Sequence, residues 1–242
     1  MNATVAQLTV RSLLGRRRAL LLIPLPGVLI LLAVLARALA GQNSDIAVGL
    51  LGGFGLATVV PLVGLIAGTG AIGPEIDEGS IIYLLAKPVS RFSIATTKII
   101  VAVTVIAIFA ALPTLIAALI LSGGSGRLAV AYPLGALVAG TAYGALFVLL
   151  AVITRHAVII GLFYALIWES LVGSYVPGAQ ALSIQQWSLA FTEKALGGRA
   201  AQLHVESALG LSVSISLLLI VTLGCTWLAG WRLRSLRLTS DD

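Results

Sequence analysis

Six long apolar stretches occupy most of this chain of 242 residues, and they constrain its fold more than any other feature. A helix that crosses a bilayer needs about 20 consecutive, mostly apolar residues. The stretches that meet this requirement cover residues 19–40, 46–72, 95–121, 129–153, 157–177 and 207–230. They leave no room for a separate soluble domain. We therefore expect an all-α, polytopic membrane protein whose six transmembrane helices form one transmembrane domain, residues 1–242.

The composition agrees with this interpretation. Hydrophobic residues make up 59% of the chain and charged residues only 10%, whereas a soluble domain carries about 25% charged residues. The first stretch is too long for a cleavable signal peptide, has Arg37 near its end and precedes no small-x-small cleavage site. It is expected to remain as the first span.

The basic residues indicate an orientation in the membrane. Lys and Arg concentrate in the cytoplasmic connections of membrane proteins. With the N-terminus inside, the inner connections carry eleven of them: Arg11, Arg16, Arg17, Arg18, Lys87, Arg91, Lys98, Arg155, Arg232, Arg234 and Arg237. The outer ones carry four: Arg37, Arg127, Lys194 and Arg199. The net charge of +6 is thus a topology signal rather than a sign of nucleic-acid binding, and we expect both termini to be cytoplasmic.

Two segments outside the spans have helical patterns. Residues 2–18 combine apolar positions at helical spacing with four arginines, which is typical of an amphipathic helix at the inner membrane surface. A frayed basic tail is the alternative interpretation. Residues 178–206 form the one long outer connection and are expected to contain short helices that rest at the outer interface.

Catalytic and metal-binding motifs are absent from the sequence. It contains no G-x-x-x-x-G-K-[ST] phosphate loop, no H-E-x-x-H motif and no cysteine pair, since Cys225 is the one cysteine. Its two histidines, His156 and His204, are expected on opposite sides of the membrane, which disfavours a zinc site. We therefore expect neither an enzyme, nor a metal site, nor a cofactor on this chain.

Glycines mark a close helix contact in the second span. Gly64 and Gly68 form a G-x-x-x-G pair, which lets two helix backbones approach closely. The pair fits a contact within one subunit at least as well as a contact between two subunits.

The connection between the second and third spans is the most informative segment. Residues 75–91 read EIDEGSIIYLLAKPVSR. Pro74 favours a helix start, and the acidic residues that follow suit the positive end of a helix dipole. Pro88 ends the helix, and Lys87, Arg91 and Lys98 are expected to hold the next span at the inner surface. Apolar side chains, a tyrosine and charges of both signs in one short amphipathic helix favour a protein partner.

This connection resembles the first cytoplasmic loop of the six-span permeases of type-2 ABC transporters, the exporter-like class. The shared features are Glu75, Glu78, Gly79, Ser80, the apolar run from Ile81 to Leu85, Lys87, Pro88, Val89, Ser90, Arg91 and Lys98. A second resemblance lies in the fifth span and the segment after it, at Trp168, Glu169, Pro177, Gly178 and Ser183. The six-span layout and the amphipathic N-terminal segment also match, so the resemblance extends over essentially the whole chain.

The resemblance implies a permease subunit of the cell membrane that exports its cargo. Residues 74–92 would form a coupling helix that docks on a separate cytoplasmic ABC ATPase subunit, and a second membrane subunit, identical or related, would complete the transporter. ATP and magnesium would bind to the ATPase and not to this chain. The docking residues implied in this way are Glu75, Glu78, Gly79, Ile81, Tyr83, Leu84, Leu85, Lys87, Pro88 and Arg91.

Glu169 lies deep within the fifth span, where a charged side chain needs a protein or water partner. One hypothesis makes Trp168 and Glu169 part of the pathway or its outer gate. The other makes Glu169 a cap for the outer helices or a partner of Arg127 or Arg199.

Two other functions stay open. An ion-coupled secondary transporter would need polar sites at the membrane midplane, for which Glu169 is the one candidate. A membrane scaffold that holds an ATPase without transporting anything would use the same loop. The scarcity of polar groups in the spans favours an apolar or amphipathic cargo.

Overall fold

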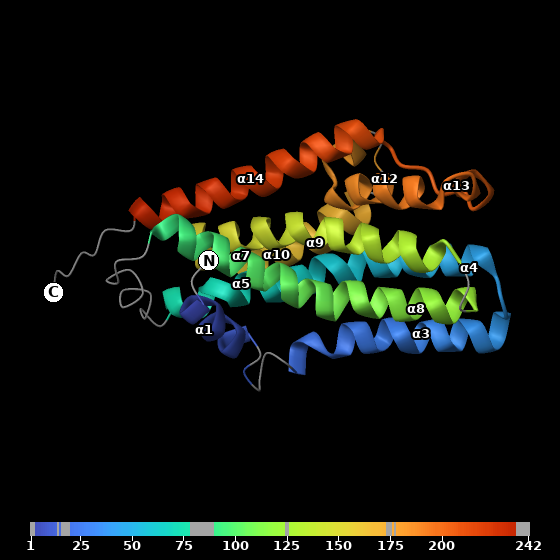
Figure 1. The fold of residues 1–242 in the computed structure, drawn as a ribbon, viewed down its shortest axis with the longest axis horizontal. Helices are drawn as coiled ribbons and strands as arrows, with labels where there is room; N and C mark the ends of the chain where they lie inside the picture. The colour runs from blue at the N-terminus through green and yellow to red at the C-terminus, as the bar shows by residue number, and fades with distance from the viewer. Residues whose placement is uncertain are drawn as a thin grey trace.

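The protein folds into an elongated bundle of helices (Figure 1). The computed structural model describes residues 3–13, 15, 20–77, 90–123, 126–172, 176 and 178–235, and no strand occurs in this part of the chain. The beginning of α1 (Ala3–Leu13) and the end of α14 (Leu211–Ser235) lie at the same end of the bundle, whereas α4 (Ser44–Val48) and α13 (Arg199–Gln202) lie at the opposite end.

Several of the spans are built from consecutive helical segments, some of them π-helical. The remaining elements are α3 (Pro24–Ala40), η1 (Gly49–Val59), α5 (Val60–Asp77), α7 (Arg91–Ile106), η2 (Ala107–Ala111), α8 (Leu112–Ser122), α9 (Leu128–Ile153), α10 (Ala157–Phe163), η3 (Tyr164–Val172), η4 (Ala179–Leu182) and α12 (Ile184–Leu196). Of these, η1, η2 and η3 are π-helical and η4 is a 3₁₀ helix.

The predicted all-α, polytopic membrane fold is confirmed. Five helices of the described chain are long and apolar enough to cross a membrane: Leu20–Ala40, Ser44–Ile76, Arg91–Ser122, Leu128–Ile153 and Leu211–Arg234. The apolar helix Ala157–Glu169 is shorter and takes the place of the expected span 157–177. The helices η4, α12 and α13 lie within the expected segment 178–206.

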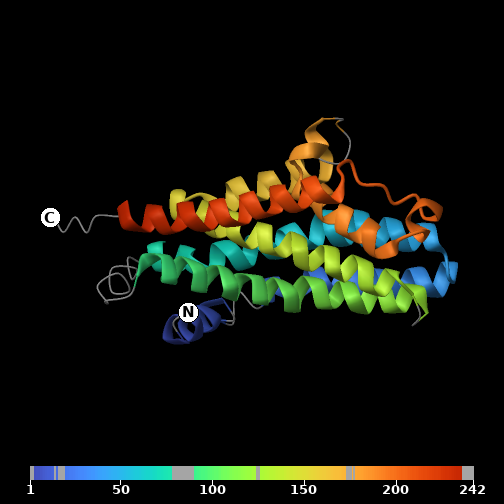
Figure 2. The ribbon, with the colours of Figure 1, turned by 45° about the horizontal axis from the view of Figure 1, so that its top comes forward.

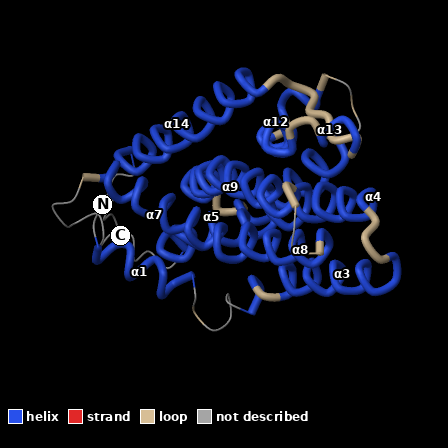
Figure 3. The backbone as a smooth tube through the Cα atoms, turned by 45° about the vertical axis from the view of Figure 1, so that its right-hand side comes forward, coloured by secondary structure: helices blue, strands red, loops and turns tan. Residues whose placement is uncertain are grey.

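Helix α9 forms the centre of the bundle. It packs against α5, α7, α8, α12 and α14, which surround it (Figure 3). Its small residues allow this density of contacts: Ala136, Ala139 and Ala142 are fully buried. In Figure 2, α1 lies beside the first turns of α7, at one end of the bundle. Contacts of α1 with both α5 and α7 hold it there.

Pro74 does not begin a new helix, contrary to the sequence-based expectation. It lies inside α5, which continues to Asp77. A proline inside a membrane helix is tolerated where other groups satisfy the backbone around it. Lys98 donates a hydrogen bond of 2.6 Å to the carbonyl of Ala71, in the turn before Pro74. The turn before the proline is thus bonded to α7 as well.

Gly64 and Gly68 make a contact within the subunit. A Cβ on Gly64 would lie 2.9 Å from Cβ of Tyr143, and one on Gly68 would lie 2.6 Å from Cβ of Phe147. Both partners belong to α9. The G-x-x-x-G pair therefore brings α5 and α9 together, as backbone contact through small residues does in membranes.

We expect Gly68→Ala to destabilise the bundle by about 1–3 kcal/mol, the usual cost of overpacking a filled contact. Gly73→Ala is the matched control, because it lies on the same helix and its Cβ would meet nothing within 4 Å. Thermal unfolding in detergent measures the difference. Equal unfolding temperatures for the two variants would contradict the proposed role of the close contact.

Candidate functional site

The candidate site is the frame that holds the connection between α5 and α7. Of the ten predicted docking residues, the structure describes Glu75 and Arg91. The other eight lie outside the described residues: Glu78, Gly79, Ile81, Tyr83, Leu84, Leu85, Lys87 and Pro88. The two described residues stand at the two ends of this connection, so their contacts define how it is attached to the bundle.

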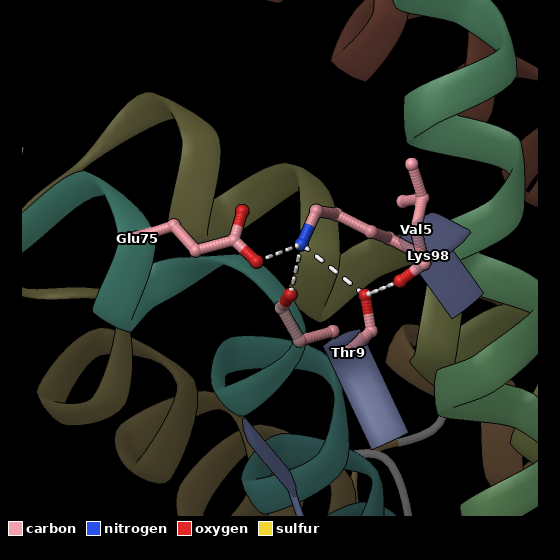
Figure 4. Close-up of polar contacts among 5 residues, drawn as sticks. Val5, Thr9, Glu75 and Lys98 are labelled. Carbon is pink, nitrogen blue, oxygen red and sulfur yellow. Dashed lines mark hydrogen bonds and ion pairs between the residues drawn. The ribbon is translucent and has the colours of Figure 1, made fainter. Parts of the chain in front are cut away.

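Glu75, near the end of α5, forms an ion pair with Lys98 of α7 (Figure 4). The Lys98 Nζ atom lies 2.7 Å from Glu75 Oε1 and 2.6 Å from the carbonyl oxygen of Ala71. A longer contact of 3.5 Å joins it to Oγ1 of Thr9 on α1. One ammonium group thereby links three helices.

The environment of Lys98 adds to the sequence-based expectation. Its side chain is fully buried, whereas that of Glu75 is 21% exposed. The sequence pattern predicted that Lys98 helps to hold the start of the third span at the inner surface, and the structure adds that its ammonium is paired inside the bundle. A buried ammonium is costly unless it is paired and hydrogen-bonded, and Glu75 together with the Ala71 carbonyl meets both requirements.

Helix α1 is fixed against this pair from the side. Thr9 is fully buried, and its hydroxyl donates to the carbonyl of Val5 at 2.8 Å. The hydroxyl oxygen thus keeps its lone pairs toward Lys98, the donor across the helix contact. Val5 and Leu13 are buried while Leu8 and Val10 are exposed, so α1 buries one face against α5 and α7.

Arg91, the first residue of α7, is bound to the end of α14. Its Nη1 atom donates to the carbonyl oxygens of Leu233 and Arg234, each at 2.8 Å. Carbonyls in the last turn of a helix have no partner within it, and a guanidinium satisfies them well. Ser90 caps the start of α7 by accepting from the backbone N–H of Ser93.

A second contact joins the same two helices. The guanidinium of Arg234 lies 4.5 Å from the ring centroid of Phe92, a cation–π geometry. Gly230 lets the ring approach, since a Cβ there would clash with the Phe92 ring. The start of α7 is thus attached to the end of α14 by both Arg91 and Phe92.

Glu75 and Arg91, on either side of segment 78–89, are thus each tied to another helix. One end continues from α5, where Glu75 is tied to α7 and lies next to α1. The other end leads into α7, where Arg91 is tied to α14. Glu75 and Arg91 therefore connect α5, α7 and α14 at this end of the bundle, with α1 packed beside Glu75 and Lys98.

Glu169, the residue considered for the pathway or its outer gate, belongs to η3. It is fully buried, and its carboxylate lies against the start of α12. Its Oε1 accepts from the Tyr164 hydroxyl at 2.7 Å and from the backbone N–H of Ile184 at 3.0 Å. Its Oε2 accepts from the Ser183 hydroxyl at 2.6 Å and from the N–H of Gln185 at 3.3 Å.

These contacts describe a helix cap. The first N–H groups of a helix have no partner within it, and a carboxylate there satisfies them and complements the helix dipole. Ser183 completes the cap by accepting from the N–H of Gln186. Arg127, considered above as a partner of Glu169, instead donates to the carbonyl of Leu196 at 3.0 Å, at the other end of α12.

Trp168 is half-buried beside this cap, and its Nε1 lies 3.5 Å from the carbonyl oxygen of Leu182. The stronger indole contact belongs to Trp187, whose Nε1 donates to the carbonyl of Ala181 at 2.8 Å. Both indoles therefore fix the turn that leads into α12. No group of three or more His, Cys, Asp or Glu side chains that could hold a metal ion occurs in the described part of the chain.

A comparison with models of known protein families gave a match. The family model described as ABC-2 family transporter protein matches residues 28–203, well over half of the chain. Neither the curated proteins nor the solved structures contain a match.

Proposed function

The chain belongs to the ABC-2 transporter family, and we propose that it is the permease subunit of an ATP-driven exporter, coupled to a separate cytoplasmic ATPase through residues 74–92. A family of this kind forms the membrane part of a transporter and works with an ABC ATPase. The observation that carries the proposal is the attachment of Glu75 and Arg91, which lie on either side of segment 78–89, to other helices of the bundle.

The attachment suits a segment that transmits force. In the proposed cycle, ATP and magnesium bind to the partner ATPase, and closure of an ATPase pair displaces the docked segment. The ion pair of Glu75 with Lys98 would pass this displacement to α7, and α1 packs beside the pair. The bonds of Arg91 to the last carbonyls of α14 would pass it to that helix.

The remaining parts of the proposal concern assembly, orientation and cargo. A second membrane subunit, identical or related, would complete the pathway, and both termini would face the cytoplasm of a cell membrane. The interior of the bundle around α9 is predominantly apolar. The spans also carry few polar side chains, which favours an apolar or amphipathic cargo taken from the cytoplasm or the inner leaflet.

The experiment that tests coupling is the double substitution Tyr83→Asp and Leu84→Asp. Two carboxylates in place of an aromatic and an aliphatic side chain should abolish binding of the ATPase, because buried apolar anchors dominate protein interfaces. Insertion into the membrane should be unchanged. Co-purification of the tagged subunit with its ATPase measures the effect.

Leu182→Asp is the control, since this exposed leucine lies in η4, outside the loop. If the double variant still bound its ATPase with unchanged affinity, the proposed docking role of this loop would be wrong. Reconstitution of the wild-type complex in vesicles then separates transport from scaffolding. Cargo movement driven by ATP supports the exporter, and ATPase binding without any cargo movement supports the scaffold.

A further inference from the structure

A second polar site lies at the end of the bundle that carries α4 and α13, opposite the end where α14 finishes (Figure 1). A cavity of about 220 Å³ opens there between α4, the end of α8, the start of α9, the end of α12 and α13. Drug-sized ligands occupy pockets of roughly 300–1,000 Å³. The cavity is therefore of a size for a small ion or a headgroup.

The lining of this cavity is cationic. Arg127 and Arg199 both line it, and no carboxylate from the described residues does. Of the nearby acids, Glu193 accepts two hydrogen bonds from Ser207, away from the cavity. The polar lining otherwise consists of neutral groups, including Gln42, Asn43, Ser122 and Gln202. Such a surface favours an anion with several oxygen atoms.

The two arginines retain donors for a ligand. Arg127 uses one of its five N–H groups on the carbonyl of Leu196. The side chain of Arg199 makes no hydrogen bond or ion pair with any residue in the described part of the chain. A planar guanidinium offers a fork of donors that matches phosphate oxygens.

A third donor is buried in the same wall. The hydroxyl of Ser122 is inaccessible to solvent and has no hydrogen-bond partner within the described chain. Buried hydroxyls are normally satisfied, and each exception needs an explanation. Rotation about χ1 would turn this hydroxyl into the cavity that Ser122 lines, where a ligand oxygen would supply the partner.

The backbone is also shaped for these side chains. Gly197 adopts φ +58°, and a Cβ there would lie 2.9 Å from Nη1 of Arg127. The arginine thus lies against a glycine at the C-terminal end of α12, which fixes the position of its guanidinium. We propose that this cavity binds a phosphate-type oxyanion, supplied either by a lipid headgroup or by free phosphate, and that the anion ties α4, α9 and α13 together.

The test uses the full-length protein, purified in detergent and depleted of lipid. Two probes distinguish the sources of the anion. Inorganic phosphate, with chloride at equal ionic strength as reference, is titrated by calorimetry. Phosphatidylglycerol, with diacylglycerol of the same chains as the phosphate-free reference, is titrated by native mass spectrometry. One of the two phosphate compounds should bind saturably and raise the unfolding temperature.

Arg199→Gln is the decisive variant, because Arg199 is exposed and its removal should leave the fold intact. It should weaken binding about tenfold or more, as expected for the loss of a charge-assisted hydrogen bond. Ser122→Ala should weaken it severalfold. Lys194→Gln is the matched control, since it removes one exposed positive charge from α12 outside this cavity.

The outcomes are separable. Binding of inorganic phosphate that Arg199→Gln weakens identifies a site for a soluble anion. Binding of phosphatidylglycerol alone, weakened in the same variant, identifies a lipid site. The proposal is overturned if neither compound binds, or if Arg199→Gln and Ser122→Ala bind as tightly as Lys194→Gln.

Discussion

Replacing Glu75 with Leu is expected to destabilise the folded bundle by about 3–5 kcal/mol, the cost of leaving one member of a buried ion pair without its partner. Lys98 is fully buried, so its ammonium group cannot turn to water when the carboxylate is removed. The Ala71 carbonyl would remain as its main acceptor. Unfolding by SDS in mixed micelles measures the change.

The double variant Glu75→Leu with Lys98→Met shows whether the lost stability comes from the unpaired ammonium or from the changed side chain at position 75. Replacing both charges with apolar groups removes the unpaired ion, so most of the lost stability should return. Glu206→Leu, which removes an exposed carboxylate, serves as control. If Glu75→Leu were no less stable than the control, or if the double variant were no better than the single one, the ion pair would not join these helices as described.

Replacing Glu169 with Leu is the second large effect. It removes the acceptor of the hydrogen bonds donated by Tyr164, by Ser183 and by the backbone N–H groups of Ile184 and Gln185. Each buried donor left without a partner costs about 1–3 kcal/mol. We expect a loss of several kcal/mol, by the sum of these costs, and faster amide exchange at the start of α12.

Glu169→Gln discriminates between a cap and an ion-coupling group. The amide keeps one acceptor oxygen, so the loss of stability should be smaller than with Leu, and the assembled protein should retain transport. Amide exchange at Ile184 and Gln185 reports the cap directly. A Gln variant with a wild-type exchange pattern and no transport would favour the ion-coupled transporter instead.

The spans could be predicted because the length of an apolar helix is set by the thickness of the bilayer. The same pattern does not reveal partners. Lys98 was expected at the surface, although a lone charge within an apolar run requires a partner. Its partner Glu75 lies 23 positions earlier in the chain, and Thr9 lies 89 positions earlier. Only the packing of α1 and α5 on α7 brings them together.

The other site residues show the same limit. Arg91 binds a carbonyl 142 positions away, at the end of α14, and no local pattern connects the two. The contacts of Glu169 are easier to predict from sequence. Ser183 stands directly before an amphipathic helix, a position where capping residues are found. The docking role of the loop is predicted from its sequence motif and from the family resemblance alone, since residues 78–89 lie outside the described chain.

Co-purification from native membranes in mild detergent, with identification of the bound proteins and an ATPase assay, tests the central proposal most directly. Our account predicts a stoichiometric partner with a nucleotide-binding motif, ATP turnover in the complex, and loss of both in the Tyr83→Asp, Leu84→Asp variant. A protein that transports cargo in vesicles but carries no ATPase in any detergent would contradict it.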